Sequence, residues 1–165
     1  MSDVVIVGAK RTAIGSFLGQ FTGTPTPTLG SAAIAGALAQ SGLATGQVDE
    51  VIMGCVLPAG LGQAPARQAM RAAGIPDAAG ATTVNKVCGS GMKAVMLAHD
   101  IIKAGSASVV VAGGMESMTN APHLLNGSRT GVRYGSAEFL DHMAFYEDAA
   151  GFERAIAGFV PHLAH

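Results

Sequence analysis

The stretch that decides the fold reads NKVCGSGMKAV and spans residues 85–95. A β-branched run ends here, two glycines flank a tight turn, and an apolar pattern with helical spacing begins. The stretch therefore predicts a strand that turns directly into a helix, with Cys88 at the turn.

Cys88 at such a turn has the surroundings of a nucleophile. The first amides of a helix lack intrahelical acceptors and carry the positive end of the helix dipole, so they stabilise a thiolate. Gly89 and Gly91 carry no Cβ atom that would keep an acyl group from these amides, which are also suited to bind an oxyanion. A cysteine in an apolar setting is more often inert packing, however, so the stretch alone leaves both interpretations open.

Strand and helix patterns alternate outward from this turn. Runs of β-branched and apolar residues predict strands at residues 4–7, 50–56, 81–87 and 108–112, and helical spacing predicts helices at residues 29–40, 65–72 and 89–103. The short connections between them are typical of parallel βαβ units. We therefore expect an α/β fold in the order βαβαβαβ, with a mostly parallel sheet covered by helices on both faces.

The same patterns predict burial for two elements. Residues 4–7 form a continuous β-branched run, which predicts a central strand buried on both faces. The helix at residues 89–103 has polar residues on one flank only, so we expect it to be almost entirely buried.

The two cysteines differ in their predicted surroundings. Cys88 follows the third predicted strand at its carboxyl end, which is where parallel sheets bind ligands, so position and chemistry together favour a catalytic Cys88. Cys55 lies on the second predicted strand with no glycine-rich context after it. We expect Cys55 to pack in the core.

Composition limits the classes of partner. The chain has 165 residues, enough for one domain, and a net charge of −1 with no cluster of lysine and arginine, so we expect neither nucleic acid nor a membrane surface as a partner. Charged residues make up 13% of the chain, against a usual value of about 25%. So little charge predicts that another subunit, or another part of the protein, covers much of the surface.

The cellular compartment is predicted from the same sequence. No apolar run reaches the roughly 18 residues that a membrane-spanning helix needs. The first residues are unlike a signal peptide. We therefore expect a cytoplasmic protein with free thiols.

Three further segments carry long motifs: RTAIGSF at residues 11–17, GQAPARQ at 62–68, and GGMESM at 113–118, which leads to APH at 121–123. Together with residues 85–95 they resemble the N-terminal part of thiolases, the family that joins or cleaves acyl-CoA thioesters through an acyl-cysteine. The resemblance runs from residue 4 to about residue 142 and is closest to the acetyl-CoA acetyltransferase branch. Cys88 falls on the family's acylated cysteine.

The resemblance implies a thiolase-like N-terminal domain and a two-step acyl transfer. The Cys88 thiolate would attack an acyl-CoA thioester and release CoA, and a carbanion from a second acetyl-CoA would then take the acyl group in a Claisen condensation. Thiolysis of a 3-ketoacyl-CoA is the reverse of this sequence. The implied activity is that of a transferase in lipid metabolism, with no cofactor beyond the CoA thioester substrates and no metal ion.

The resemblance also implies self-association. The expected assembly is a homodimer or a tetramer. Residues 118–135 resemble the loop through which thiolase dimers associate into tetramers, and an ordinary surface loop is the alternative.

The sequence departs from the family pattern towards its carboxyl end. Thiolases are much longer, and their second half supplies a histidine that activates the cysteine, a second cysteine that moves the substrate proton, and an Asn-His oxyanion site; none of these motifs occurs here. We expect a nucleophile domain at residues 1–142 and a divergent tail at residues 143–165, which is either an aberrant or truncated terminus or a replacement helix. The chain alone is expected to be inactive. Two alternatives stay open: an inactive remnant that only self-associates, and a small cysteine hydrolase that uses His123.

Other residues of catalytic type have ordinary interpretations. His99 lies too far along its helix to reach Cys88, so we expect it to make a hydrogen bond at the side of the helix. Glu116 follows the fourth predicted strand, where a buried hydrogen-bonding role is favoured over catalysis. Four methionines fit either an acyl pocket or irregular gaps in the core; they are Met92, Met96, Met115 and Met118.

Overall fold

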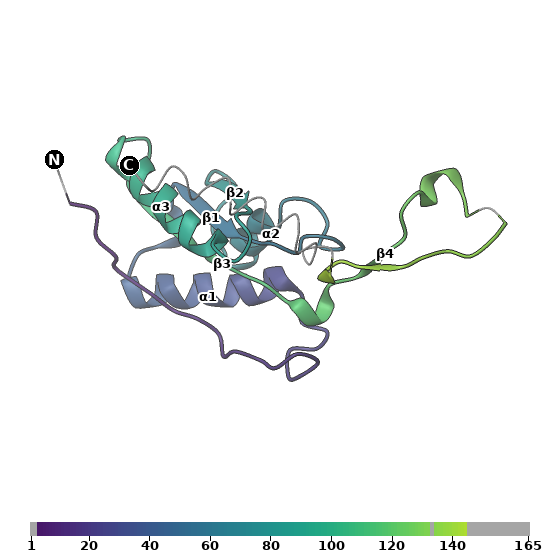
Figure 1. Cartoon of the computed structure of the whole chain (residues 1–165). Helices are drawn as coiled ribbons and strands as arrows, with labels where there is room; N and C mark the ends of the chain where they lie inside the picture. The colour runs from purple at the N-terminus through teal and green to yellow at the C-terminus, as the bar shows by residue number, and fades with distance from the viewer. Residues whose placement is uncertain (1–2, 133, 145–165) are drawn as a thin grey trace, which may run out of the picture. The chain divides into compact units, whose positions relative to one another are not determined.

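The computed structural model describes residues 3–132 and 134–144, which fall into two compact units (Figure 1). The first unit ends at Asn120 and the second begins at Ala121. The first unit contains, in chain order, α1 (Thr26–Ser41), the 3₁₀ turn η1 (Thr45–Gln47), β1 (Glu50–Gly54), α2 (Pro65–Ala72), β2 (Gly80–Val84), α3 (Ser90–Lys103), β3 (Val110–Gly114) and η2 (Met118–Asn120). The second unit contains β4 (His123–Leu124), η3 (Ser128–Thr130) and β5 (Leu140–Asp141).

A parallel three-stranded sheet forms the centre of the first unit, with the strand order β2-β1-β3. The last residues of the three strands lie opposite one another in the register; they are Gly54, Val84 and Gly114. All three strands therefore end at the same edge of the sheet. The α/β class with parallel βαβ units is confirmed for these strands.

Helices cover both faces of this sheet, as predicted (Figure 1). On one face, Val51, Met53 and Cys55 pack in a core cluster with residues from α1, α2 and the end of β3. On the other face, the end of β1 meets the start of α3, where a Cβ atom built on Gly54 would lie 2.7 Å from the Ser90 Cβ. The core cluster also includes Ile34, Leu38, Ala66, Ala69, Met70 and Met115. Burial of a large side chain such as that of Ile34, Leu38 or Met70 contributes about 1.5–3 kcal/mol, so this cluster is a main source of stability for the unit.

Proline and glycine set the helix ends, as the sequence predicts. Pro65 is the first residue of α2. Gly42 ends α1 in the left-handed conformation with φ 72°, and its N–H donates to the Leu38 carbonyl oxygen at 3.1 Å. The start of α1 differs from the prediction at residue 29, because Pro25 fits the N-cap position and Pro27 the first turn, so that the helix begins at Thr26.

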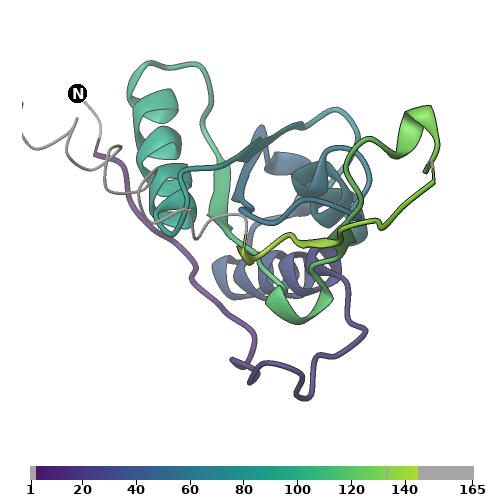
Figure 2. The same cartoon turned by 45° about the vertical axis from the view of Figure 1, so that its right-hand side comes forward.

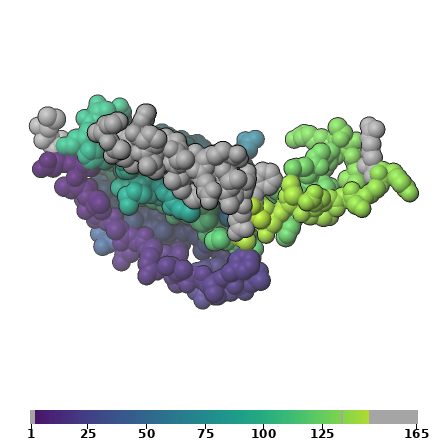
Figure 3. Space-filling model, in the orientation of Figure 1, coloured from purple at the N-terminus to yellow at the C-terminus, as the bar shows by residue number. Residues whose placement is uncertain are grey.

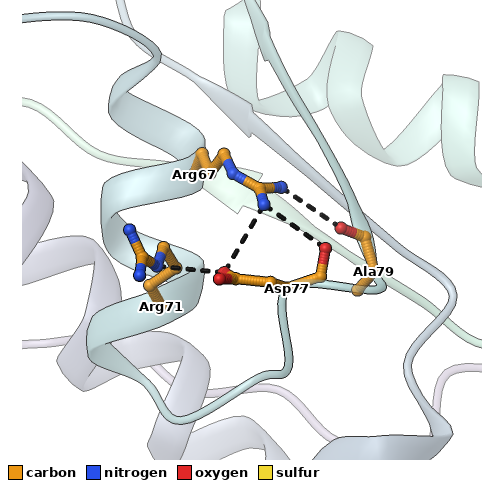
Figure 4. Close-up of polar contacts among 4 residues, drawn as sticks. All are labelled: Arg67, Arg71, Asp77 and Ala79. Carbon is orange, nitrogen blue, oxygen red and sulfur yellow. Dashed lines mark hydrogen bonds and ion pairs between the residues drawn. The ribbon is translucent and has the colours of Figure 1, made fainter.

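Two arginines of α2 hold the connection between α2 and β2 (Figure 4). Arg67 Nη2 lies 3.4 Å from Asp77 Oδ1, and Arg71 Nε lies 3.0 Å from the same oxygen. The Arg67 guanidinium also donates to the carbonyl oxygens of Asp77 at 3.3 Å and Ala79 at 3.5 Å. Ion pairs between exposed side chains contribute about 0–1 kcal/mol. These contacts therefore fix the conformation of the segment before β2 more than they stabilise the fold.

The prediction of a central strand at residues 4–7 is wrong. These residues pair with no strand among the described residues, and Val5, Ile6 and Val7 are 71%, 80% and 57% exposed. The segment passes α1 (Figure 2) and lies at the surface (Figure 3). The Ala9 N–H donates to Gln40 Oε1 of α1 at 3.1 Å. β-Branched residues favour a strand where a strand edge is available to pair with, and this segment lies beside a helix instead.

The predicted burial of the helix after Cys88 is also wrong. Ser90, Ala94 and Ala98 are the buried residues of α3, whereas Met92 and Met96 are 69% and 50% exposed. The helix packs a face of small residues onto the sheet and leaves Met92, Val95 and Met96 exposed, whereas Leu97, Ile101 and Ile102 are half-buried. An apolar pattern shows that a helix face avoids water, but it does not show which element of the chain will cover that face.

Several strand ends differ from the prediction: β1 ends at Gly54 and not at residue 56, and β3 ends at Gly114 and not at residue 112. Two further differences have local reasons. β2 ends at Val84 and not at residue 87, because Val87 has φ 48°, a left-handed conformation that cannot continue a strand. β3 begins at Val110 and not at residue 108, because the Asp49 carboxylate accepts the N–H groups of Ser108 and Val109 at 2.7 and 3.0 Å.

In the second unit, β4 and β5 pair antiparallel, with His123 opposite Asp141 and Leu124 opposite Leu140. The expected boundary between residues 142 and 143 stays a prediction, and residues 145–165 of the expected tail lie outside the described residues. In the part of the chain that the structure describes, no helix combines the length and the hydropathy that crossing a bilayer would require.

Candidate functional site

Cys88 is exposed and lies immediately before Gly89, the N-cap residue of α3. Its predicted place at the amino end of this helix is confirmed. It does not follow the strand directly, because Asn85, Lys86 and Val87 separate it from the end of β2. The sulfur is thus carried by a short loop at the edge of the sheet where the strands end.

The Ser90 side chain closes this loop. Its hydroxyl donates to the Val87 carbonyl oxygen at 2.6 Å and accepts the Lys86 N–H at 2.8 Å, and the residue is 3% exposed. The Asn85 side-chain oxygen accepts the Val87 N–H at 2.9 Å. These contacts hold Val87 at φ 48°, a conformation that costs a non-glycine residue about 1–3 kcal/mol and persists where the surroundings enforce it. The loop therefore presents Cys88 in a fixed conformation.

Three glycines let the amino end of α3 lie directly on the sheet. A Cβ atom built on Gly54 would lie 2.6 Å from the Gly91 nitrogen, closer than real side chains approach. A Cβ atom built on Gly114 would lie 3.3 Å from Gly91 Cα. Gly54 and Gly114 are the last residues of β1 and β3, so their lack of a side chain places the first turn of α3 at the carboxyl ends of both strands.

The helix end beside Cys88 keeps its positive character. The first turn of α3 contains no aspartate or glutamate that would oppose the dipole. Its first amides have no intrahelical acceptors, and those of Gly89 and Ser90 donate instead to the carbonyl oxygens of Lys86 at 3.0 Å and Val87 at 3.1 Å. The arrangement has the chemical requirements of a thiol nucleophile. The expectation that the amides of the first turn bind an oxyanion is wrong for Gly89 and Ser90, because both already donate to backbone carbonyl oxygens.

Cys55 has the opposite surroundings. It is 1% exposed in the core cluster, directly after β1, and its Sγ lies 3.7 Å from Glu116 Oε1. Burial, and then the negative charge and hydrogen bond of Glu116, raise the pKa of the Cys55 thiol to about 12. Cys55 is therefore a protonated packing residue at neutral pH, as predicted.

Glu116 makes hydrogen bonds to backbone amides, which confirms its predicted hydrogen-bonding role. Its two carboxylate oxygens accept the N–H groups of Val56 at 2.7 Å and Leu57 at 3.0 Å. The residue is half-buried and follows β3 at the same edge of the sheet as Cys88.

His99 and His123 lie outside residues 85–95, the segment that carries Cys88. His99 is exposed on α3, and its Nδ1 lies 3.1 Å from Asp100 Oδ1, which is the predicted contact at the side of the helix. His123 lies on β4 in the second unit, and its role as a base for Cys88 stays a prediction. Among the residues that the structure describes, no three His, Cys, Asp or Glu side chains gather in a group that could hold a metal ion.

The methionines divide between the two interpretations. Met115 is 6% exposed and belongs to the core cluster. Met92, Met96 and Met118 have exposed side chains. The structure therefore supports a core role for Met115, and the acyl-pocket interpretation of the other three stays a prediction.

Comparison with known proteins identifies the family. The family described as thiolase, N-terminal domain, matches residues 4–159. The chain belongs to the thiolase family. The resemblance drawn from the four sequence segments is thus confirmed, and the match continues beyond residue 142.

Named relatives support the same branch of the thiolase family. Acetyl-CoA acetyltransferase of Pseudomonas aeruginosa is 56% identical over 143 residues, which are 87% of this chain and 36% of that protein. The acetyl-CoA acetyltransferase of Cupriavidus necator is 57% identical over 143 residues, which are 87% of this chain and 36% of that protein. The mitochondrial acetyl-CoA acetyltransferase of Rattus norvegicus is 50% identical over 141 residues, which are 86% of this chain and 33% of that protein. The chain thus spans about a third of the length of these relatives.

The structure reveals site residues whose roles the sequence did not predict. Ser90 and Asn85 lie within the quoted stretch at residues 85–95, but their contacts with the loop were not expected. Gly54 was placed on a strand, with no prediction that α3 would lie against it. A glycine at the end of an apolar strand run is the signal that would have indicated this close approach.

Proposed function

We propose that this chain is the nucleophile-bearing part of a thiolase-type acyltransferase. The reaction is the condensation of two acetyl-CoA molecules to acetoacetyl-CoA and CoA, or the reverse thiolysis. The observation that carries the proposal is an exposed Cys88 in a fixed loop at the amino end of α3, at the edge where the parallel strands end. The acetyl-CoA acetyltransferases among its relatives support acetyl-CoA as the substrate.

In the first step the Cys88 thiolate attacks the carbonyl carbon of acetyl-CoA. The electron pair of the C=O bond moves to oxygen, and the backbone N–H of Cys88 stabilises the resulting oxyanion. Collapse of this intermediate re-forms the C=O bond, breaks the bond to the CoA sulfur and leaves acetyl-Cys88. The CoA thiolate takes up a proton.

In the second step a second acetyl-CoA loses a methyl proton to a base, and the resulting carbanion attacks the carbonyl carbon of acetyl-Cys88. The carbon–sulfur bond breaks, so that Cys88 is regenerated and acetoacetyl-CoA is released. The resemblance assigns the base for this step to motifs that this sequence lacks. We therefore propose that the chain alone carries out the acylation step and does not turn over.

We also propose that the protein works in lipid metabolism, in the cytoplasm, as a homodimer or tetramer. The low content of charged residues supports a covered surface. The exposed apolar side chains of residues 5–7 and of α3 support it as well.

The test of the proposed function is acetylation of the full chain by acetyl-CoA, followed by mass spectrometry of the intact protein. We expect one acetyl group, located on Cys88 by peptide mapping and removed by an excess of CoA. Cys88→Ala should abolish the adduct, and the matched Cys55→Ala variant should retain it. An unmodified wild-type chain, or an adduct that persists in Cys88→Ala, would refute the proposal.

A self-associating remnant without catalysis is the second candidate, and the exposed apolar side chains favour it. It predicts a stable oligomer in which Cys88 is not acetylated by acetyl-CoA. The acetylation experiment therefore separates the two functions.

A further inference from the structure

We propose that Glu116 is a positioning residue for Cys88, acting through the loop after β1 and through Asn85. The inference rests on the proposed function, because it assigns a role in preparing the nucleophile of that reaction. The inference is supported by a continuous set of hydrogen bonds that joins the ends of β1, β2 and β3.

The first part of this set is the carboxylate itself. The Met115 N–H donates to the Gly54 carbonyl oxygen at 2.9 Å, which extends the pairing of β3 with β1 by one residue and brings Glu116 beside the loop after β1. There its oxygens accept the N–H groups of Val56 and Leu57 at 2.7 and 3.0 Å. Hydrogen bonds to a charged acceptor are shorter and roughly twice as strong as neutral ones. The carboxylate thus fixes the backbone at residues 56 and 57.

The second part links this loop to the nucleophile. The Val56 carbonyl oxygen accepts from Asn85 Nδ2 at 3.4 Å, and Asn85 Oδ1 accepts the Val87 N–H at 2.9 Å. The two ends of one amide side chain therefore join the loop after β1 to the residue immediately before Cys88. Val87 is the residue with φ 48°, so the link acts on the strained position of the loop.

The other side of the Cys88 loop is held by α3. The Val87 carbonyl oxygen accepts from the buried Ser90 hydroxyl at 2.6 Å, and Ser90 is the first residue of α3. Glu116 thereby fixes one side of the Cys88 loop, and Ser90 fixes the other. Without the carboxylate, we expect residues 56 and 57 to shift, Asn85 to lose its anchor, and Cys88 to lose its alignment with the helix end.

The chain offers a matched control in Asp49. Its carboxylate also accepts two consecutive backbone amides, those of Ser108 and Val109 at 2.7 and 3.0 Å. Asp49 precedes β1, however, so it lies at the edge of the sheet where the strands begin. Asp49→Asn removes the same kind of contact from the same sheet at the edge remote from Cys88.

The experiment measures the rate constant for alkylation of Cys88 by iodoacetamide in the full chain, with the wild type, Glu116→Gln and Asp49→Asn. Loss of alignment with a helix end is worth about 1 kcal/mol, so we expect Glu116→Gln to slow alkylation about fivefold. Asp49→Asn should leave the rate unchanged. An unchanged or faster rate in Glu116→Gln, or equal slowing in both variants, would overturn the inference.

Asn85→Ala provides a second test at an exposed position, which is useful if Glu116→Gln does not fold. It should also slow alkylation, and the Glu116→Gln/Asn85→Ala double variant should be slower by less than the product of the two single effects. Independent, multiplicative effects would show that Glu116 does not act through Asn85.

Acetylation provides a readout that a purely structural role would not change. For a positioning residue, the rate at saturating acetyl-CoA should fall in Glu116→Gln while the acetyl-CoA concentration for half the maximal rate stays constant. A rise in that concentration with no fall in the maximal rate would contradict positioning. Alkylation needs no acetyl-CoA, so a wild-type chain that is alkylated but never acetylated would refute the proposed function alone.

Discussion

At the scale of the residue, the nucleophile depends on a serine that has no part in the chemistry. Ser90 is buried, and its hydroxyl joins the backbone on both sides of the strained Val87. In a loop without backbone strain, loss of this hydroxyl would have little effect on the geometry of the neighbouring residues. Here it links the stability of the loop to the geometry of Cys88.

Ser90→Ala should lower the free energy of unfolding by about 1–2 kcal/mol, because one buried side chain loses two backbone hydrogen bonds. Urea denaturation measures the change. The control is Ser31→Ala on α1, whose exposed hydroxyl also bonds the carbonyl oxygen three residues earlier, Thr28 at 2.9 Å. We expect less than about 0.5 kcal/mol there, and equal losses in the two variants would count against a special role for Ser90.

Cys55 makes the stability of the folded protein depend on pH in the alkaline range. The folded pKa of about 12 lies above the ordinary value of 9.0, so the folded state holds its proton where the unfolded state releases it. The contribution to stability is complete below pH 9.0 and is lost progressively as the pH rises towards about 12. Urea denaturation on both sides of pH 9.0 should show a smaller alkaline loss of stability in Cys55→Ala than in the wild type. An identical loss in the two proteins would contradict this assignment.

At the scale of the element, the junction of β1 with α3 determines where Cys88 lies. Helix and sheet are in contact there because Gly54 has no side chain. The contact links the end of a central strand to the first turn of the helix that follows the nucleophile.

Gly54→Ala should destabilise the fold by about 1–3 kcal/mol, because the new methyl group would collide with the backbone of Gly91. Alkylation of Cys88 should slow in the same variant, since α3 has to move away from the sheet. Gly36→Ala on α1 is the control: its Cβ would lie 3.4 Å from the flexible Lys10 side chain, and the helix should gain about 0.5–1 kcal/mol. A tolerated Gly54→Ala would show that the close packing is dispensable.

Local signals in the sequence were sufficient for most of these elements. The apolar runs around β1 and β2 and the Pro65 and Gly42 signals act over a few residues, so they predict element type and helix ends well. The strand predicted at residues 4–7 failed because pairing depends on a partner edge, which no local pattern specifies. The place of Cys88 followed from its glycine context, whereas the contacts of Asn85 and Glu116 join segments far apart in the chain and became visible only in the structure.

At the scale of the whole molecule, the main feature is apolar surface. The helix α3 and residues 5–7 expose large aliphatic side chains, in a chain with 13% charged residues. Surfaces of this kind mark contacts with another protein surface.

We therefore expect the protein to run as a dimer or a larger assembly in size-exclusion chromatography with light scattering. Met96→Lys should shift the equilibrium towards smaller species if α3 contributes to the contact, because a charge replaces a half-exposed apolar side chain. A wild-type protein that stays monomeric at high concentration would contradict the expectation.

The central claim is that the fold makes one of its two cysteines a nucleophile and keeps the other inert. Competitive labelling of the full chain with iodoacetamide near neutral pH, read by mass spectrometry of the two cysteine peptides, tests it directly. The account predicts rapid labelling of Cys88 at the exposed amino end of α3 and slow labelling of Cys55 in the core. Equal rates in the folded chain, or faster labelling of Cys55, would contradict it.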